Sequence, residues 1–283
     1  MAKVQLFTDS ISDIPQEWID TYNIGIIPLY IVFGNTSYRD RIDMNTHQMY
    51  QRVEEEGRLP KTAAPSPLDF MNQFAAAIAN GDDVLYISMS SKLSSTYQNA
   101  TLAAKEYPHG QVTIFDSMNI SAGLAMHVLI AARMASKGES ILAIVQELEM
   151  IRSQVQMNVL VNSLDYLHKG GRVGNLQHML GSMLRVRPVL YVTNGIVLSG
   201  AKYRGSQRKI IKNLMNSILE HLHQIEPTLF IIAQTMEEDA ANWLRNMILE
   251  QTGVQEVYVI EGGCAICSHS GPHSLAISFV LKH

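Results

Sequence analysis

Short apolar runs alternate with helical patterns through the first half of the chain, and this alternation restricts the possible folds more than any other feature. Apolar runs predict buried strands at residues 4–8, 25–33, 84–88 and 111–116. Helical patterns lie between and after them, at residues 15–22, 45–56, 66–80, 94–107, 121–137 and 140–153. Strands separated by helices of this length indicate βαβ units in a mostly parallel sheet.

The second half of the chain follows a different pattern. Strands are predicted at residues 157–161, 189–193, 196–201, 229–234, 254–260 and 274–281, and helices at 206–223 and 238–251. Asn194-Gly195 between two of these strands predicts a hairpin, because Asn-Gly suits a type I′ turn. A hairpin mixed with helices indicates an α+β arrangement, so we place a boundary near Gln154. The expected fold class is α/β with two domains, a mostly parallel one at 1–154 and a smaller mixed α+β one at 155–283.

Composition and charge exclude several classes of protein. The 283 residues are 47% hydrophobic and carry a net charge of -4, which argues against a nucleic-acid partner. No apolar run reaches the roughly 18 residues of a membrane span, so we expect no integral membrane association. The N-terminus lacks the apolar region of a signal peptide, and two cysteines do not suggest a disulfide framework. We therefore expect a cytoplasmic protein.

Small polar residues follow three predicted strands of the first domain. Asp9-Ser10 ends the first strand, serines from Ser88 to Ser95 follow the third, and Asp116-Ser117 ends the fourth. Ligands of open α/β sheets bind outside the carboxyl ends of the strands, so we expect these residues to face one crevice. The segment 90–97 combines hydroxyls with a helix N-terminus, which suits an anion. The alternative is an ordinary serine-rich helix cap with its hydroxyls in solvent.

Two further candidates lie in predicted loops. Thr62 precedes a capped helix, and its hydroxyl could donate a hydrogen bond to an anion. Arg172 follows Gly170-Gly171 and could pair with a carboxylate or a phosphate. Each is a weak signal when it is taken alone.

A group of possible metal ligands lies near the C-terminus, within one predicted loop. It consists of Cys264, Cys267, His269 and His273, which are zinc-ligand types. A tetrahedral site usually draws its ligands from two separated elements, and this segment supplies all four within a short span. The preferred alternative is that His269 alone donates a hydrogen bond near an anion, so we expect no metal.

Six short segments carry a family resemblance through their order and spacing. They are Thr8-Asp9-Ser10 with Asp13-Ile14-Pro15, Lys61-Thr62 with Pro65-Ser66-Pro67, the segment 91–98, Asp116-Ser117, Gly170-Gly171-Arg172 and His269-Ser270-Gly271-Pro272. With them the whole chain resembles the DegV family, whose members include the fatty-acid-binding subunits of bacterial fatty acid kinase. The chain departs from the family pattern at Ser95 and His273, where glycine is common, and at Cys264 and Cys267.

The resemblance implies a DegV-type fold that holds one fatty acid, such as palmitate or oleate, between the two domains. Thr62 and Ser94 match the family's threonine and serine that bind the carboxylate, and His269 matches its nearby histidine. Ser95 adds a hydroxyl beside Ser94, and Arg172 matches the family arginine linked to phosphoryl transfer or kinase docking. We expect three further residues in the vicinity of the head group: Asp9, Ser10 and Ser117.

The implied function is that of a lipid carrier rather than an enzyme, with no cofactor. The protein would bind a long-chain fatty acid and present the carboxylate to a separate kinase subunit. The kinase would form the acyl phosphate, which would pass to phospholipid synthesis. The chain has no G-x-x-x-x-G-K-[ST] loop, so it is not expected to phosphorylate the lipid itself.

Two alternatives use the same residues. A serine hydrolase would combine Ser94, His269 and Asp116, but its expected G-x-S-x-G elbow does not match Leu93-Ser94-Ser95. A module that binds a phosphorylated metabolite at the anion site would need a polar pocket. The Met- and Leu-rich segment 179–184 does not suggest such a pocket.

Overall fold

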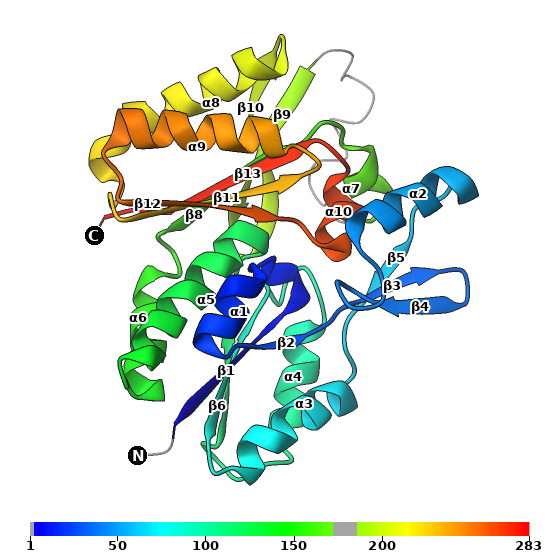
Figure 1. Ribbon diagram of the computed structural model, residues 1–283, viewed down its shortest axis with the longest axis vertical. Coiled ribbons are helices and arrows are strands. Elements are labelled where there is room, and N and C mark those ends of the chain that lie inside the picture. The colour runs from blue at the N-terminus through cyan, green and yellow to red at the C-terminus, as the bar shows by residue number, and fades with distance from the viewer. Residues whose placement is uncertain (1–2, 172–185, 283) are drawn as a thin grey trace.

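The computed structural model describes residues 3–171 and 186–282 (Figure 1). Its first sheet has four parallel strands in the order β2-β1-β6-β7. The strands are β1 (Val4–Asp9), β2 (Gly25–Ile27), β6 (Asp83–Ser88) and β7 (Val112–Asp116). Every neighbouring pair in this sheet is parallel, so the prediction of a mostly parallel N-terminal sheet is confirmed.

Helices cover both faces of the parallel sheet. The helices of this half are α1 (Gln16–Tyr22), α3 (Pro67–Ala79), α4 (Thr96–Ala104), α5 (Ser121–Ser136) and α6 (Ile141–Ile151). Helices α3 and α4 pack together on one face, where Phe70 and Phe74 contact Tyr86 of β6. Helix α5 packs on the other face, against β1 and β6 (Figure 1). Ser66 caps α3 and Pro67 occupies its first turn, as the sequence predicts.

The prediction of one long strand at residues 25–33 is wrong. The run divides at Pro28, which has no N–H to donate to a strand ladder. Only the first part belongs to the parallel sheet as β2. The second part, β3 (Tyr30–Phe33), joins two strands that the sequence analysis missed, β4 (Thr36–Arg39) and β5 (Lys61–Ala63), in a separate sheet of order β4-β3-β5. Thr62 therefore lies in a strand, opposite Ile31, and not in a loop.

The second half builds a six-stranded sheet in the order β10-β9-β8-β13-β11-β12. Its strands are β8 (Val155–Leu160), β9 (Val186–Thr193), β10 (Ile196–Arg204), β11 (Leu229–Thr235), β12 (Glu256–Glu261) and β13 (Ser274–Val280). Only the β11–β12 pair is parallel. Asn194 and Gly195 both have positive φ at the tip of the β9–β10 hairpin, which fits the predicted type I′ turn.

The remaining helices flank the second sheet and its connection to the first. They are α2 (Thr46–Glu56), α7 (Asp165–Lys169), α8 (Gln207–Glu220), α9 (Glu238–Thr252) and α10 (Cys264–Ser270). Helices α8 and α9 cover one face of the six-stranded sheet, while α5 covers the other and lies between the two sheets (Figure 1). The predicted domain boundary near Gln154 falls between α6 and β8 and stays a prediction. Within the described ranges, no helix combines the length and apolar character that crossing a membrane requires.

Helix α10 replaces the loop that the sequence analysis expects at Cys264–Ser270. Gly263 precedes it and makes no side-chain cap, so the local sequence carries no helix-start signal. The backbone N–H groups at its start donate to Asp13 and Asp40, which are distant in the sequence. The local sequence does not predict this helix, because the side chains that cap it belong to a distant part of the chain.

Candidate ligand-binding site

A cavity of about 340 Å³ opens where the N-terminal half meets helix α10. We call it the outer cavity. Most of its lining is apolar, for example Leu29, Met89 and Ile266. Its polar side chains, among the described residues, are the four predicted to bind a carboxylate: Thr62, Ser94, Ser95 and His269. The fold therefore brings together residues that are up to 207 positions apart in the sequence.

Thr62 and His269 form the closest contact of the site. The Oγ1 atom of Thr62 lies 2.9 Å from Nε2 of His269, a hydrogen bond whose donor depends on the imidazole tautomer. Thr62 comes from β5 and His269 from α10. Gly170 packs so closely on the ring that a Cβ there would lie 2.2 Å from Nδ1 of His269. The imidazole is thus held between β5 and the end of α7.

Ser94 and Ser95 face the outer cavity from the start of helix α4. The Ser94 hydroxyl lies 2.7 Å from that of Thr96 and accepts a hydrogen bond from the Thr96 N–H at 3.3 Å. Ser95 is the N-cap residue, is exposed, and makes no side-chain capping bond. A helix N-terminus with adjacent hydroxyls stabilises a negative charge. Ser94 therefore accepts a hydrogen bond from the start of the helix, and both serines line the cavity.

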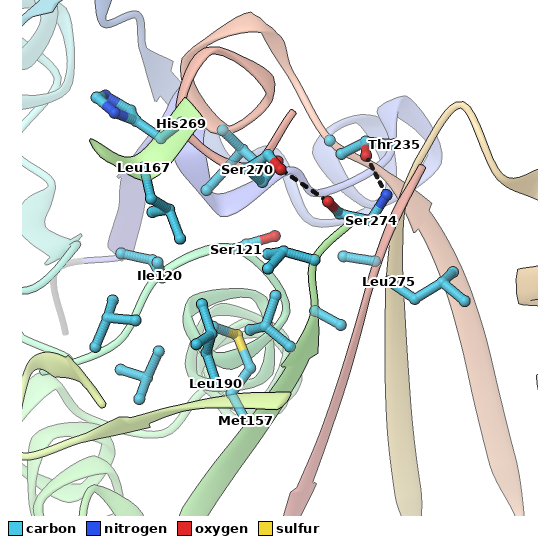
Figure 2. Close-up of a pocket in the computed structure, with 18 residues that line it drawn as sticks. Ile120, Ser121, Met157, Leu167, Leu190, Thr235, His269, Ser270, Ser274 and Leu275 are labelled. Carbon is cyan, nitrogen blue, oxygen red and sulfur yellow. Dashed lines mark hydrogen bonds between the residues drawn. The ribbon is translucent and has the colours of Figure 1, made fainter. Parts of the chain in front are cut away.

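An inner chamber of about 70 Å³ adjoins the outer cavity. The two share five lining residues: Ile120, Leu167, Val197, Ile266 and His269. Strands of the second sheet supply much of the inner wall, including Met157, Leu190, Ala233 and Ala276. In Figure 2 the side chains of Ile120, Met157, Leu167 and Leu190 surround the chamber, while the His269 ring points away to one side.

The hydroxyls near the inner chamber are used by the protein itself. Thr235 donates to the carbonyl of Gly271 at 2.8 Å, and Ser274 donates to the carbonyl of Ser270 at 2.9 Å. Ser121 donates to Asp13. What the chamber offers a ligand is therefore apolar. The two adjoining cavities have a polar end at Thr62, Ser94 and His269 and an apolar end among the strands, an arrangement that suits an amphiphilic ligand.

The placement of three residues in the vicinity of the head group stays a prediction. Asp9, Ser10 and Ser117 are fully buried and line neither the outer cavity nor the inner chamber. Ser10 donates to Asp40 at 2.8 Å, and Ser117 accepts from the Asn119 N–H at 3.1 Å. All three lie at the carboxyl ends of strands or directly after them, as predicted, but their side chains bond within the core. Arg172 and the segment 179–184 lie outside the described residues.

The buried carboxyl of Asp9 is expected to make the stability of the protein depend on pH. Its Oδ2 accepts hydrogen bonds from the Tyr86 hydroxyl at 2.9 Å and from the Met89 N–H at 3.0 Å. Complete burial raises the pKa of Asp9 from 3.8 to about 7. The folded protein therefore holds a proton that the unfolded chain releases above pH 3.8, and the free energy of unfolding falls as pH rises towards about 7.

We expect Asp9→Asn to flatten the fall in the free energy of unfolding between about pH 4 and 7, because the amide does not ionise. The effect at neutral pH is on the order of 4 kcal/mol, at about 1.4 kcal/mol for each pKa unit. Urea unfolding across this range measures it. Asp43→Asn is the control, because Arg39 lowers the pKa of Asp43 to about 2, below the range. An unchanged slope for Asp9→Asn would contradict the prediction.

The cysteines and histidines of the C-terminal segment do not converge on one point. The buried thiols of Cys264 and Cys267 donate to the carbonyls of Met44 and Gly262, both at 3.3 Å. His273 pairs with Glu237 at 2.8 Å. In the part of the chain that the structure describes, no three His, Cys, Asp or Glu side chains are arranged to hold a metal. Burial also raises the pKa of Cys264 to about 12, so the thiol is neutral in the metal-free protein.

The proposed hydrolase residues are also engaged separately. Asp116 accepts hydrogen bonds from the backbone N–H groups of Ser91 and Met118. The Ser94 hydroxyl pairs with Thr96, and His269 pairs with Thr62. A catalytic triad requires the nucleophile to bond the histidine and the acid to orient it. The hydrogen bonds of Ser94 to Thr96, of His269 to Thr62 and of Asp116 to backbone N–H groups are not the bonds of such a relay.

Comparison with known proteins assigns the family. A family model described as "Uncharacterised protein, DegV family" matches residues 3–282. The chain belongs to the DegV family. A DegV domain-containing protein of Deinococcus radiodurans is 31% identical over 280 residues, which cover 97% of each chain. A fatty acid-binding protein of Thermotoga maritima is 30% identical over 275 residues, which cover 95% of each chain.

Solved structures of DegV proteins share this fold. A DegV family protein of Thermus thermophilus, described by its fatty acid binding, has a TM-score of 0.92 and 33% identity, and the match covers 99% of this chain and 100% of that one. A DegV lipid-binding protein of Thermotoga maritima has a TM-score of 0.87 and 28% identity, with 99% of each chain covered. The predicted DegV-like α/β fold class is therefore confirmed.

Proposed function

We propose that this DegV protein binds one long-chain fatty acid, with the carboxylate at Thr62, Ser94 and His269 and the far end of the acyl chain in the inner chamber. The observation that carries the proposal is the arrangement of polarity. Four polar side chains gather at the outer end of two adjoining cavities whose inner end is apolar. The Thermus and Thermotoga relatives are described as binding fatty acids, which supports the same class of ligand.

The energetics of such a ligand divide between its two ends. Each methylene moved from water into the chamber contributes about 0.8 kcal/mol, so the acyl chain supplies most of the affinity. The carboxylate loses hydration and needs hydrogen bonds in return. The hydroxyls of Thr62 and Ser94, with the N-terminus of α4, can supply them. The carboxylate thus sets the direction in which the ligand binds, and burial of the acyl chain supplies most of the affinity.

We further propose that the bound carboxylate is presented to a separate kinase in the cytoplasm, which forms the acyl phosphate. The exposed Ser95 and the half-buried Thr62 and Ser94 place the polar end of the site near solvent, where a partner can reach it. The chain lacks a phosphate-binding loop of its own. Arg172 remains the predicted residue for phosphoryl transfer or kinase docking.

The two alternatives have less support. The separate bonding of Ser94, His269 and Asp116 does not favour hydrolysis. A phosphorylated metabolite could use the same anion end, but it would leave the apolar inner chamber unfilled. The fatty acid accounts for both ends of the site, so it is the ligand we propose.

Native mass spectrometry with organic extraction tests the proposal directly. We expect protein purified from a bacterial host to carry about one fatty acid per chain, and stripped protein to take up palmitate or oleate. A sugar phosphate added in excess should not displace the lipid. A protein that is empty on purification and does not take up added palmitate or oleate would overturn the proposed function.

A further inference from the structure

The helix that carries His269 depends on distant residues for its N-terminal cap. Its own N-cap, Gly263, offers no side chain, and the first N–H groups of any helix need acceptors from outside it. The Oδ1 atom of Asp13 accepts from the Gly263 N–H at 2.8 Å. The Oδ1 atom of Asp40 accepts from the Cys264 N–H, also at 2.8 Å. These acids precede their partners by 250 and 224 residues.

Both carboxyls are buried and fully engaged. Asp13 is 1% exposed and Asp40 is fully buried. Their second oxygens accept from the hydroxyls of Ser121 and Ser10. Burying a carboxyl is costly even when it is hydrogen-bonded, and a single serine or asparagine before the helix would cap it with less desolvation. The observed arrangement fixes the position of α10 against the N-terminal half of the chain, which a local cap cannot do.

Two further hydrogen bonds from helix α2 hold the helix and the residues that lead into it. The Thr46 hydroxyl donates to the Gly262 carbonyl at 3.0 Å, and the Tyr50 hydroxyl donates to the Cys267 carbonyl at 3.3 Å. His269 lies five residues after Cys264, which is about 8 Å along the axis at about 1.5 Å per residue. A small tilt at the capped end therefore displaces the imidazole. Binding sites tolerate displacements of only about 0.5 Å.

We propose that Asp13 and Asp40 are positioning residues that hold helix α10 so that His269 Nε2 meets Thr62 where the carboxylate binds. The ligand in this statement rests on the proposed function. The orientation of His269 does not, because the cap and the Thr62 contact involve the protein alone. The two ideas can therefore fail separately.

The first test compares two substitutions at Asp40. Asp40→Ala removes the acceptor and is expected to weaken palmitate binding about tenfold, but hexadecanol binding less than about twofold. Asp40→Asn restores most of the affinity, because an amide oxygen also accepts from the Cys264 N–H. Asp69→Ala is the matched control, since Asp69 caps α3, which lines no part of the outer cavity. It should leave both affinities unchanged.

A double-mutant cycle with His269→Gln separates positioning from general loss of stability. In the His269→Gln background, Asp40→Ala should weaken palmitate binding no further. An equal loss in both backgrounds, or an equal loss for palmitate and hexadecanol, would overturn the proposal. If Asp40→Ala does not fold, Asp13→Gly takes its place with Asp13→Asn as the rescue, because both replacements suit the φ of 57° at this position.

Nuclear magnetic resonance of the ligand-free protein tests, without a lipid, whether Asp40 positions His269. The imidazole ¹⁵N resonances of His269, assigned by their loss in His269→Gln, should move in Asp40→Ala, return in Asp40→Asn and stay in place in Asp69→Ala. Unmoved resonances in Asp40→Ala would overturn the positioning role. Wild-type protein that binds no fatty acid would instead overturn the proposed function and leave this measurement valid.

Discussion

Replacing Ala276 with leucine is expected to weaken the binding of palmitate and stearate roughly a hundredfold while changing the binding of dodecanoate much less. Ala276 is 7% exposed, lies on β13 and lines the inner chamber. The chamber measures about 70 Å³, so the larger leucine side chain would occupy it. Excluding four methylenes at about 0.8 kcal/mol each removes about 3 kcal/mol, which corresponds to roughly a hundredfold.

The neighbouring Ala233 provides an independent repeat of this experiment. It lies directly opposite Ala276 in the β11–β13 ladder and lines the same chamber. Ala233→Leu should produce the same loss for long chains. Ala240→Leu on α9 is the control, because that residue lies outside both cavities. Isothermal titration with a series of chain lengths measures the effect, and an equal loss at every length would show that the acyl chain does not enter the inner chamber.

The parallel sheet could be predicted because it depends on local patterns. Each of its strands is an apolar run, and α3 and α6 begin at serine caps of their own, Ser66 and Ser140. Strands β4 and β5 were missed because they are short and polar, and pairing with β3 is what makes them strands. Helix α10 was missed for a related reason, since Asp13 and Asp40 supply its cap from another part of the chain.

For the candidate site, the sequence predicts where the residues lie but not which way their side chains point. Asp9 ends β1 and Ser94 follows β6, so the sequence places both near the carboxyl edge of the parallel sheet. Only Ser94 lines the outer cavity, while Asp9 turns inward to Tyr86 and Met89. A strand end determines where a Cα lies, but the packing around it decides which way the side chain points. The family resemblance supplied the choice of Thr62, Ser94 and His269 that local patterns leave open.

Thr62→Val is expected to weaken fatty acid binding about tenfold to a hundredfold. The substitution removes the protein hydroxyl that bonds the charged carboxylate, while it preserves the shape of the side chain. The Oγ1 atom of Thr62 lies 2.9 Å from Nε2 of His269, so the substitution also removes this hydrogen bond of the imidazole.

The corresponding fatty alcohol carries no charge and should lose much less affinity than the acid. Thr101→Val is the matched control, since the Thr101 hydroxyl donates to the Tyr97 carbonyl within α4 and Thr101 is not among the described residues that line either cavity. Titration of both ligands into both variants measures the difference. If the acid and the alcohol lose affinity equally in Thr62→Val, the hydroxyl contributes to the shape of the cavity and the carboxylate must lie elsewhere. A loss confined to the acid would place the charged end of the ligand at Thr62, and with it the direction in which the chain enters the protein.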